Sequence, residues 1–86
     1  MKTTGAIITE ILETVGGRMN EWTRIADIAQ SAGLTPEEIN EGIMELLGDE
    51  EFRAEPEPFG HRTTEADKIY GPVIGGEQRH LIKWGA

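Results

Sequence analysis

Residues 33–52, GLTPEEINEGIMELLGDEEF, carry the clearest helix-start signal in the chain. Thr35 is a favoured helix cap, Pro36 suits the first helical position, and Glu38 stands three residues after the cap. Apolar residues then recur three or four positions apart, at Ile39, Ile43, Leu46 and Leu47. The stretch therefore predicts a helix from Pro36 to about Gly48 with one buried face.

A second helix is predicted immediately before this stretch. Thr23 is a suitable cap for it, Arg24 is expected outside, and Gly33 ends it because glycine accepts the backbone angles of a helix end. The inward positions are Ile25, Ala26, Ile28, Ala29 and Ala32. Ala29 allows close packing between the two helices, and Leu34 lies under the turn. Residues 23–48 therefore predict a helix-turn-helix.

The flanking segments predict one more long helix and a strand pair. Thr4 to Gly16 has an apolar helical face made of Ile7, Ile8, Ile11, Leu12 and Val15. Residues 19–22 suit a short extended piece with Trp22 against the core. Phe52–Pro56 and His80–Trp84 alternate as strands do. Between them, Thr64 and Asp67 form a capping pattern for a short helix ending near Tyr70, and Gly75-Gly76 marks a turn.

From Gly5 to about Phe59 the chain resembles the winged helix-turn-helix family. This resemblance implies an α+β fold: a three-helix winged helix-turn-helix with a C-terminal β-hairpin whose wing is elaborated by a short helical turn. One domain would span 1–86, with the wing hairpin at 52–84. The ending at 74–82 (Ile-Gly-Gly-Glu-x-x-His-Leu-Ile) is also similar to small uncharacterised winged-helix-like proteins of actinobacteria and their phages, which implies no activity.

The charge of the chain opposes a polyanionic partner. Eight basic side chains face sixteen acidic ones, for a formal net charge of −8. Residues 1–50 hold three basic against ten acidic groups, whereas residues 51–86 hold five against six. Attraction to DNA is therefore opposed over the first half and nearly neutral over the second.

A family resemblance of this kind implies DNA reading by the second helix of the pair. The outward positions of that helix, however, are Glu37, Glu38, Asn40, Glu41, Met44 and Glu45. Groove reading relies mainly on Arg and Lys, and here only Asn40 offers a base-type contact. We therefore expect a solvated acidic face, or one that binds a basic or mixed protein surface through Glu37, Asn40, Glu41, Met44 and Glu45.

The wing offers an alternative. Its basic groups are His61, Arg62, Lys68, Arg79, His80 and Lys83. If Arg62, Lys68 and Arg79 converge, they would contact double-stranded DNA, with Asn40 assisting. The competing interpretation is scattered surface charge. His80 fits a partly buried, hydrogen-bonded histidine better than a ligand.

Catalytic and metal chemistry lack a recognisable pattern. The chain has no cysteine and one serine, Ser31, and His61, Asp67, Glu77 and His80 match no metal-ligand spacing. No enzyme activity, cofactor or membrane association is expected, and a cytoplasmic protein is the default. Met44 and Leu81 are candidates for a homodimer surface. The sequence thus favours a non-enzymatic regulatory protein that binds a protein, with a DNA-binding regulator as the alternative.

Overall fold

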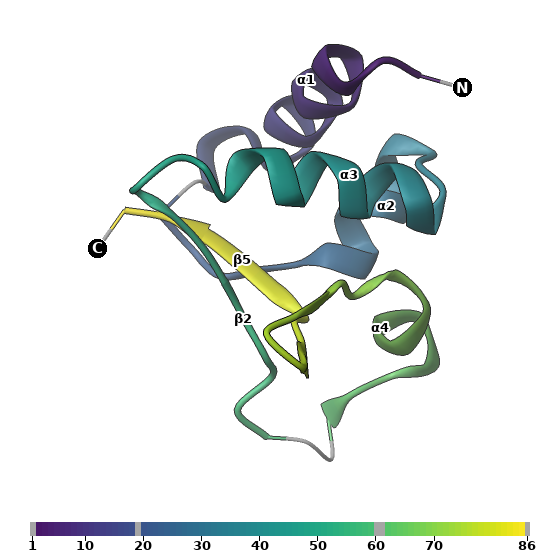
Figure 1. Ribbon diagram of the computed structural model, residues 1–86, viewed down its shortest axis with the longest axis vertical. Helices are drawn as coiled ribbons and strands as arrows, with labels where there is room; N and C mark the ends of the chain where they lie inside the picture. The colour runs from purple at the N-terminus through teal and green to yellow at the C-terminus, as the bar shows by residue number, and fades with distance from the viewer. Residues whose placement is uncertain (1, 19, 60–61, 86) are drawn as a thin grey trace.

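The computed structural model describes residues 2–18, 20–59 and 62–85. Over these residues the chain forms four α-helices and two small antiparallel sheets (Figure 1). In chain order, the elements are α1 (Thr4–Val15), the 3-10 turn η1 (Gly16–Arg18), β1 (Thr23–Arg24), α2 (Ile25–Ala32), α3 (Pro36–Leu46), β2 (Phe52–Glu55), α4 (Glu65–Tyr70), β3 (Val73–Ile74), β4 (Glu77–Gln78) and β5 (Leu81–Trp84). The expected α+β class is confirmed.

The last strand lies at the centre of the larger sheet, whose order is β1-β5-β2. Ile82 faces Thr23 on one side and Ala54 on the other. The end of the chain therefore joins the segment before α2 to the segment after α3. Successive side chains of a strand point to opposite faces, so Ile82, Ala54 and Phe52 share the buried inner face. The ring of Trp84 packs edge-on against Phe52, with centroids 4.8 Å apart.

The core is built mainly from isoleucines. Those that are at most 1% exposed are Ile7, Ile11, Ile25, Ile28, Ile39, Ile43 and Ile82. Full burial of such a side chain contributes about 1.5–3 kcal/mol. α1 packs closely on α3 because Gly42 has no side chain there. A Cβ at Gly42 would lie 2.7 Å from atoms of both Ile7 and Ile11.

Several local predictions are confirmed. Thr35 and Glu38 form the reciprocal capping box at the start of α3. Gly33 ends α2 in the left-handed conformation with φ 68°, which glycine adopts without steric cost. Thr64 and Asp67 form a second capping box at the start of α4. Gly75 and Gly76, both with positive φ, form the turn between β3 and β4.

The structure corrects the prediction for residues 22–24. Thr23 does not cap α2; it belongs to β1, and Arg24 is the residue before the helix, with no capping bond from its side chain. Trp22 is 45% exposed instead of packing in the core. Pairing of Thr23 with Ile82 extends the backbone at this point, so the sheet determines where the helix begins. Met19, from the same predicted extended piece, lies outside the described residues.

Other differences are smaller. α3 ends at Leu46, two residues before the predicted end, and Leu47 is its C-cap. β2 ends at Glu55 and β5 begins at Leu81, so each strand is one residue shorter than predicted. Ala32, Leu46 and Leu47 pack at the edge of the core and are only partly buried.

Residues 56–80 connect β2 to β5 and contain α4, β3 and β4. This connection folds back onto the helices, because α4 packs against both α2 and α3 (Figure 1). Every helix among the described residues is too short or too polar to cross a membrane.

Candidate functional site

The outer face of α3 presents a cluster of unpaired carboxylates. Glu37, Glu41 and Glu45 are exposed, and Met44 is 55% exposed between them. None of these three glutamates forms an ion pair with a cation of the described residues. Residues spaced four apart on a helix are neighbours, so the three charges form one acidic row. We call Glu37, Glu41, Met44 and Glu45 the acidic face.

Asn40 belongs to the predicted site but is turned toward its own helix. Its Nδ2 donates to the backbone oxygen of Pro36 at 2.6 Å. Its Oδ1 is buried and has no hydrogen-bond partner among the described residues. The amide donor that would read an adenine edge is therefore already engaged within α3.

Glu38 is not part of the outward surface predicted for this helix. It is 7% exposed, and its carboxylate accepts the backbone amide of Thr35 at 2.9 Å and that of Lys2 at 3.2 Å. These bonds, with that to Thr35 the larger cause, hold the pKa of Glu38 below its usual value, although burial opposes them. Glu38 therefore caps α3 and fastens the start of the chain to it.

Arg79, one of the wing cations predicted for DNA contact, points inward. Its guanidinium donates to the backbone oxygens of Ala54 at 2.9 Å and Ile74 at 3.2 Å. It also lies 3.7 Å from a carboxylate oxygen of Glu55 and 3.6 Å from one of Glu77. Arg79 therefore ties β2 to β3 and occupies a carbonyl of the outer edge of β2, which is one way that proteins protect a sheet edge.

The other two predicted wing cations have separate contacts. Arg62 is exposed and lies over the ring of Phe59, 4.8 Å from its centroid. Lys68 pairs with Glu65 at 3.5 Å on the exposed side of α4. The structure thus holds Arg62, Lys68 and Arg79 in three different sets of contacts. His61 lies outside the described residues.

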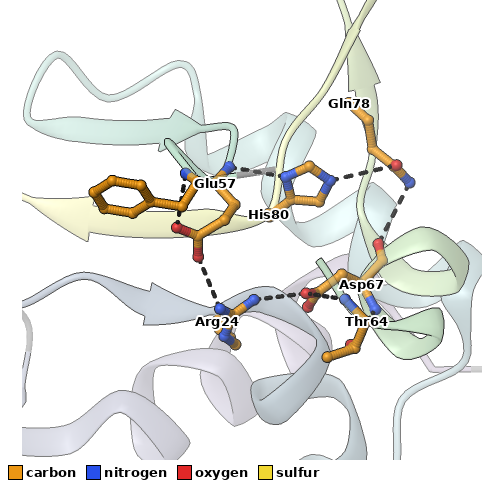
Figure 2. Close-up of polar contacts among 7 residues, drawn as sticks. Arg24, Glu57, Thr64, Asp67, Gln78 and His80 are labelled. Carbon is orange, nitrogen blue, oxygen red and sulfur yellow. Dashed lines mark hydrogen bonds and ion pairs between the residues drawn. The ribbon is translucent and has the colours of Figure 1, made fainter. Parts of the chain in front are cut away.

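A polar network that the sequence did not predict holds the connection between β2 and β5 to the segment before α2 (Figure 2). Arg24 donates through Nη1 to Asp67 at 2.6 Å and through Nη2 to Glu57 at 2.7 Å. Asp67 is 1% exposed and also accepts the amide of Thr64 at 2.9 Å. We call this contact of Arg24 with Asp67 and Glu57 the wing latch. It connects the start of α2 with both ends of residues 57–67.

His80 extends the network on its other side. Its Nδ1 accepts the backbone amide of Glu57 at 2.9 Å, so the ring proton belongs on Nε2, which faces Gln78 Oε1 at 3.4 Å. Gln78 in turn donates to backbone oxygens near the end of α4, including that of Lys68 at 2.9 Å. The expected partly buried, hydrogen-bonded state of His80 is confirmed.

The outer face of the larger sheet is the second surface of interest. Arg53 and Lys83 are directly opposite each other on β2 and β5, and Lys83 Nζ lies 5.6 Å from the ring centroid of Trp22. Beside them is a surface hollow of about 500 Å³, lined by Trp22, Pro56, Phe59, Leu81 and Arg62 among others. Strand alternation could have placed Arg53 and Lys83 on one face, but only the register makes them neighbours.

Among the described residues, no three His, Cys, Asp or Glu side chains gather as a metal site requires. Leu81, the proposed partner of Met44 in a homodimer surface, lies half-buried on β5 and lines the hollow.

Comparison of the chain with family models, curated proteins and solved structures finds no match.

Proposed function

We propose that this chain is a winged-helix variant that acts as a non-enzymatic regulatory module, and that it binds a protein partner through the acidic face of α3. The observation that carries the proposal is the row formed by Glu37, Glu41 and Glu45. These carboxylates are exposed and unpaired among the described residues, with Met44 between them. Asn40 lies at the half-buried margin of this surface.

The topology supports the winged-helix part of the proposal. A helix-turn-helix formed by α2 and α3 stands between β1 and β2, and the sheet order β1-β5-β2 puts the last strand in the middle. The connection between β2 and β5 occupies the position of a wing. Here it is folded against α2 and α3 and tied down by the wing latch.

The chemistry of the acidic face indicates the kind of partner. Repulsion among neighbouring carboxylates on a helix costs about 0.2–0.5 kcal/mol for each pair, and a basic surface would convert this cost into attraction. Met44 adds an unbranched, adaptable apolar side chain of the kind that is over-used at binding surfaces. A basic or mixed protein surface with an apolar depression is therefore the expected partner.

DNA binding through the wing has less support. The guanidinium of Arg79 already contacts backbone oxygens and carboxylates within the chain. Of the cations predicted to contact DNA, only Arg62 and Lys68 remain accessible, and these two on a chain with net charge −8 offer little attraction to a polyanion.

Capture of partners from cells that express the tagged protein tests the proposal. The variant with Glu41→Lys and Glu45→Lys should lose its partner while its circular dichroism stays unchanged. A matched control changes Glu13 and Glu21, two exposed glutamates that are not on α3, to lysine. This control has the same net charge as the variant with Glu41→Lys and Glu45→Lys, and it should retain the partner. Retention by both variants would refute the role of the acidic face.

A titration with duplex DNA tests the alternative. If the proposed function is correct, fluorescence anisotropy should detect no binding of mixed-sequence duplex DNA even at low salt. Binding that weakens steeply as salt rises, and that is lost when Arg62 and Lys68 are changed to glutamine, would favour the DNA-binding regulator instead.

A further inference from the structure

The outer face of the larger sheet has the opposite character to the acidic face. Arg53 on β2 and Lys83 on β5 are directly opposite each other. Like charges in this arrangement destabilise a sheet, and neither cation pairs with a carboxylate of the described residues. Arg62 adds a third cation at the hollow. Glu55 and Glu57 also line the hollow, so the local surplus of positive charge depends on Arg53 and Lys83.

The two carboxylates that line the hollow, Glu55 and Glu57, already contact cations of the chain. Glu57 is bound to Arg24 in the wing latch at 2.7 Å, and its side chain is 8% exposed. Glu55 lies 3.7 Å from Arg79. Arg53 and Lys83 can therefore attract a carboxylate from outside the chain. We call Arg53, Lys83 and the adjoining hollow the basic sheet face.

The hollow gives this face an apolar component. Its lining includes the rings of Trp22 and Phe59 together with Leu81 and Pro56. Trp22 is 45% exposed and Phe59 53% exposed. Aromatic rings offer favourable contacts to a thioether sulfur, and the volume of about 500 Å³ accepts a long side chain.

We propose that the basic sheet face binds the acidic face of α3 from a second copy of this chain. Glu41 and Glu45 of one copy lie against Lys83 and Arg53 of the next, and Met44 enters the hollow beside Trp22. This inference rests on the proposed function, because it names the partner of the acidic face. The acidic face supplies two carboxylates and an exposed apolar side chain within one helical turn. The basic sheet face supplies two cations beside an apolar hollow, so the two faces match in both charge and polarity.

The contact joins two different faces. Each copy therefore keeps one face of each kind for a further copy, unless the association closes into a ring. The net charge of −8 on each copy opposes approach at long range, while the local pairs attract at contact. Because the long-range repulsion opposes the local attraction, self-association is expected to be weak and concentration-dependent. Salt weakens both the repulsion and the attraction.

Sedimentation velocity over a wide range of protein concentration tests this inference. Wild-type protein should show a weight-average sedimentation coefficient that rises with concentration. The helix variant, E41K with E45K, and the sheet variant, R53E with K83E, should each associate about a hundredfold more weakly or worse, because attraction becomes repulsion. An equimolar mixture of the two variants should associate again, since the reversed helix of one fits the reversed sheet face of the other.

The control variant, E13K with E21K, separates local pairing from net charge. Two Glu→Lys changes add four charges, so the net charge moves from −8 to −4 in both this control and the helix variant. The control should associate at least as well as wild type. Backbone NMR spectra on dilution should show shifts confined to residues 41–45, 53–55 and 81–83, together with the indole of Trp22.

Three results would overturn the inference: wild type that stays monomeric at every concentration, self-association that survives both charge reversals, or a mixture that fails to associate while each variant remains folded by circular dichroism. If wild type is monomeric but still captures another protein through Glu41 and Glu45, only the identity of the partner is refuted. The proposed function would then stand.

Discussion

The substitution Arg24→Met should release residues 57–67 from the helices. Among the described residues, Arg24 is the cation that bridges Asp67 and Glu57, at 2.6 and 2.7 Å. Methionine preserves much of the unbranched stem but removes the charge, so two carboxylates that are 1% and 8% exposed would lose their common cation. Removing one partner of a buried ion pair costs about 3–5 kcal/mol, because the remaining charge is uncompensated.

The lower end of this range applies, because the side chain of Arg24 is itself 27% exposed and partly solvated. About 3 kcal/mol corresponds to a change on the order of 100-fold in an opening equilibrium. The buried core cluster contains no described residue from 56–80, and the members of this segment that pack against it, Tyr70 and Ile74, are only partly buried, so the segment can open with the isoleucine core largely intact. We therefore expect a local loss of protection in preference to global unfolding.

Amide hydrogen exchange measures this opening directly. The amides of Asp67, Lys68 and Gly71 donate to Thr64 Oγ1, to the backbone oxygen of Thr64 and to that of Asp67. In Arg24→Met these three amides should exchange on the order of 100-fold faster, while those of Ile39 and Ile43 in α3 should change little. Arg53→Met removes an exposed arginine that has no described ion pair and serves as the matched control.

A second substitution distinguishes the loss of charge compensation from the loss of packing. Asn at position 67 retains an oxygen for the amide of Thr64 but carries no charge. Adding Asp67→Asn to Arg24→Met should therefore slow the exchange again. The reasoning is refuted if Arg24→Met leaves the exchange of Asp67, Lys68 and Gly71 unchanged, or if Asp67→Asn brings no recovery.

Two further predictions concern the ends of helices. Because hydrogen bonds lower the pKa of Glu38 in the folded chain, its stabilisation is present above its ordinary value of 4.5 and is lost as pH falls below it. Glu38→Gln should flatten the decline in urea stability on acidification, and parallel curves for variant and wild type would contradict this. A Cβ at Gly71 would collide with the backbone oxygen of Arg79 and lie 2.8 Å from that of Asp67, so Gly71→Ala should lower the free energy of unfolding by about 1–3 kcal/mol in urea titrations. Gly5→Ala, which meets no atom within 4 Å, should be neutral or stabilising, and equal stability of the two variants would sink the steric explanation.

Gly71 illustrates the limit of prediction from local pattern. Gly71-Pro72 correctly marks the end of α4, but Gly71 has φ −71°, which any residue can adopt. Glycine is needed there because Arg79, eight positions away, passes too close for a side chain. That requirement arises from the pairing of β3 with β4, which brings the backbone of Arg79 beside Pro72 and Gly71.

The candidate site divides in a similar way. The helical period alone places Glu37, Glu41, Met44 and Glu45 on one outward face, and their exposure follows from it. The same period places Glu38 near the outside. Its burial depends on the amide of Lys2, thirty-six positions earlier in the chain. For Arg79 the composition of the wing predicts a surface cation, whereas contact with Ala54 makes it a structural tie.

The sequence by itself determined the features that depend on neighbours three or four residues apart. These are the capping boxes at Thr35 and Thr64, the left-handed turn at Gly33, and the inward faces of the helices, because such interactions form within one helical turn. Tertiary structure alone decided the position of β1, the wing latch and the pairing of Arg53 with Lys83. Arg24 meets its two partners across 33 and 43 positions, and Arg53 meets Lys83 only through the register of β2 on β5. Contacts at such separations exist only once the whole chain has closed around its core, so no local pattern can encode them.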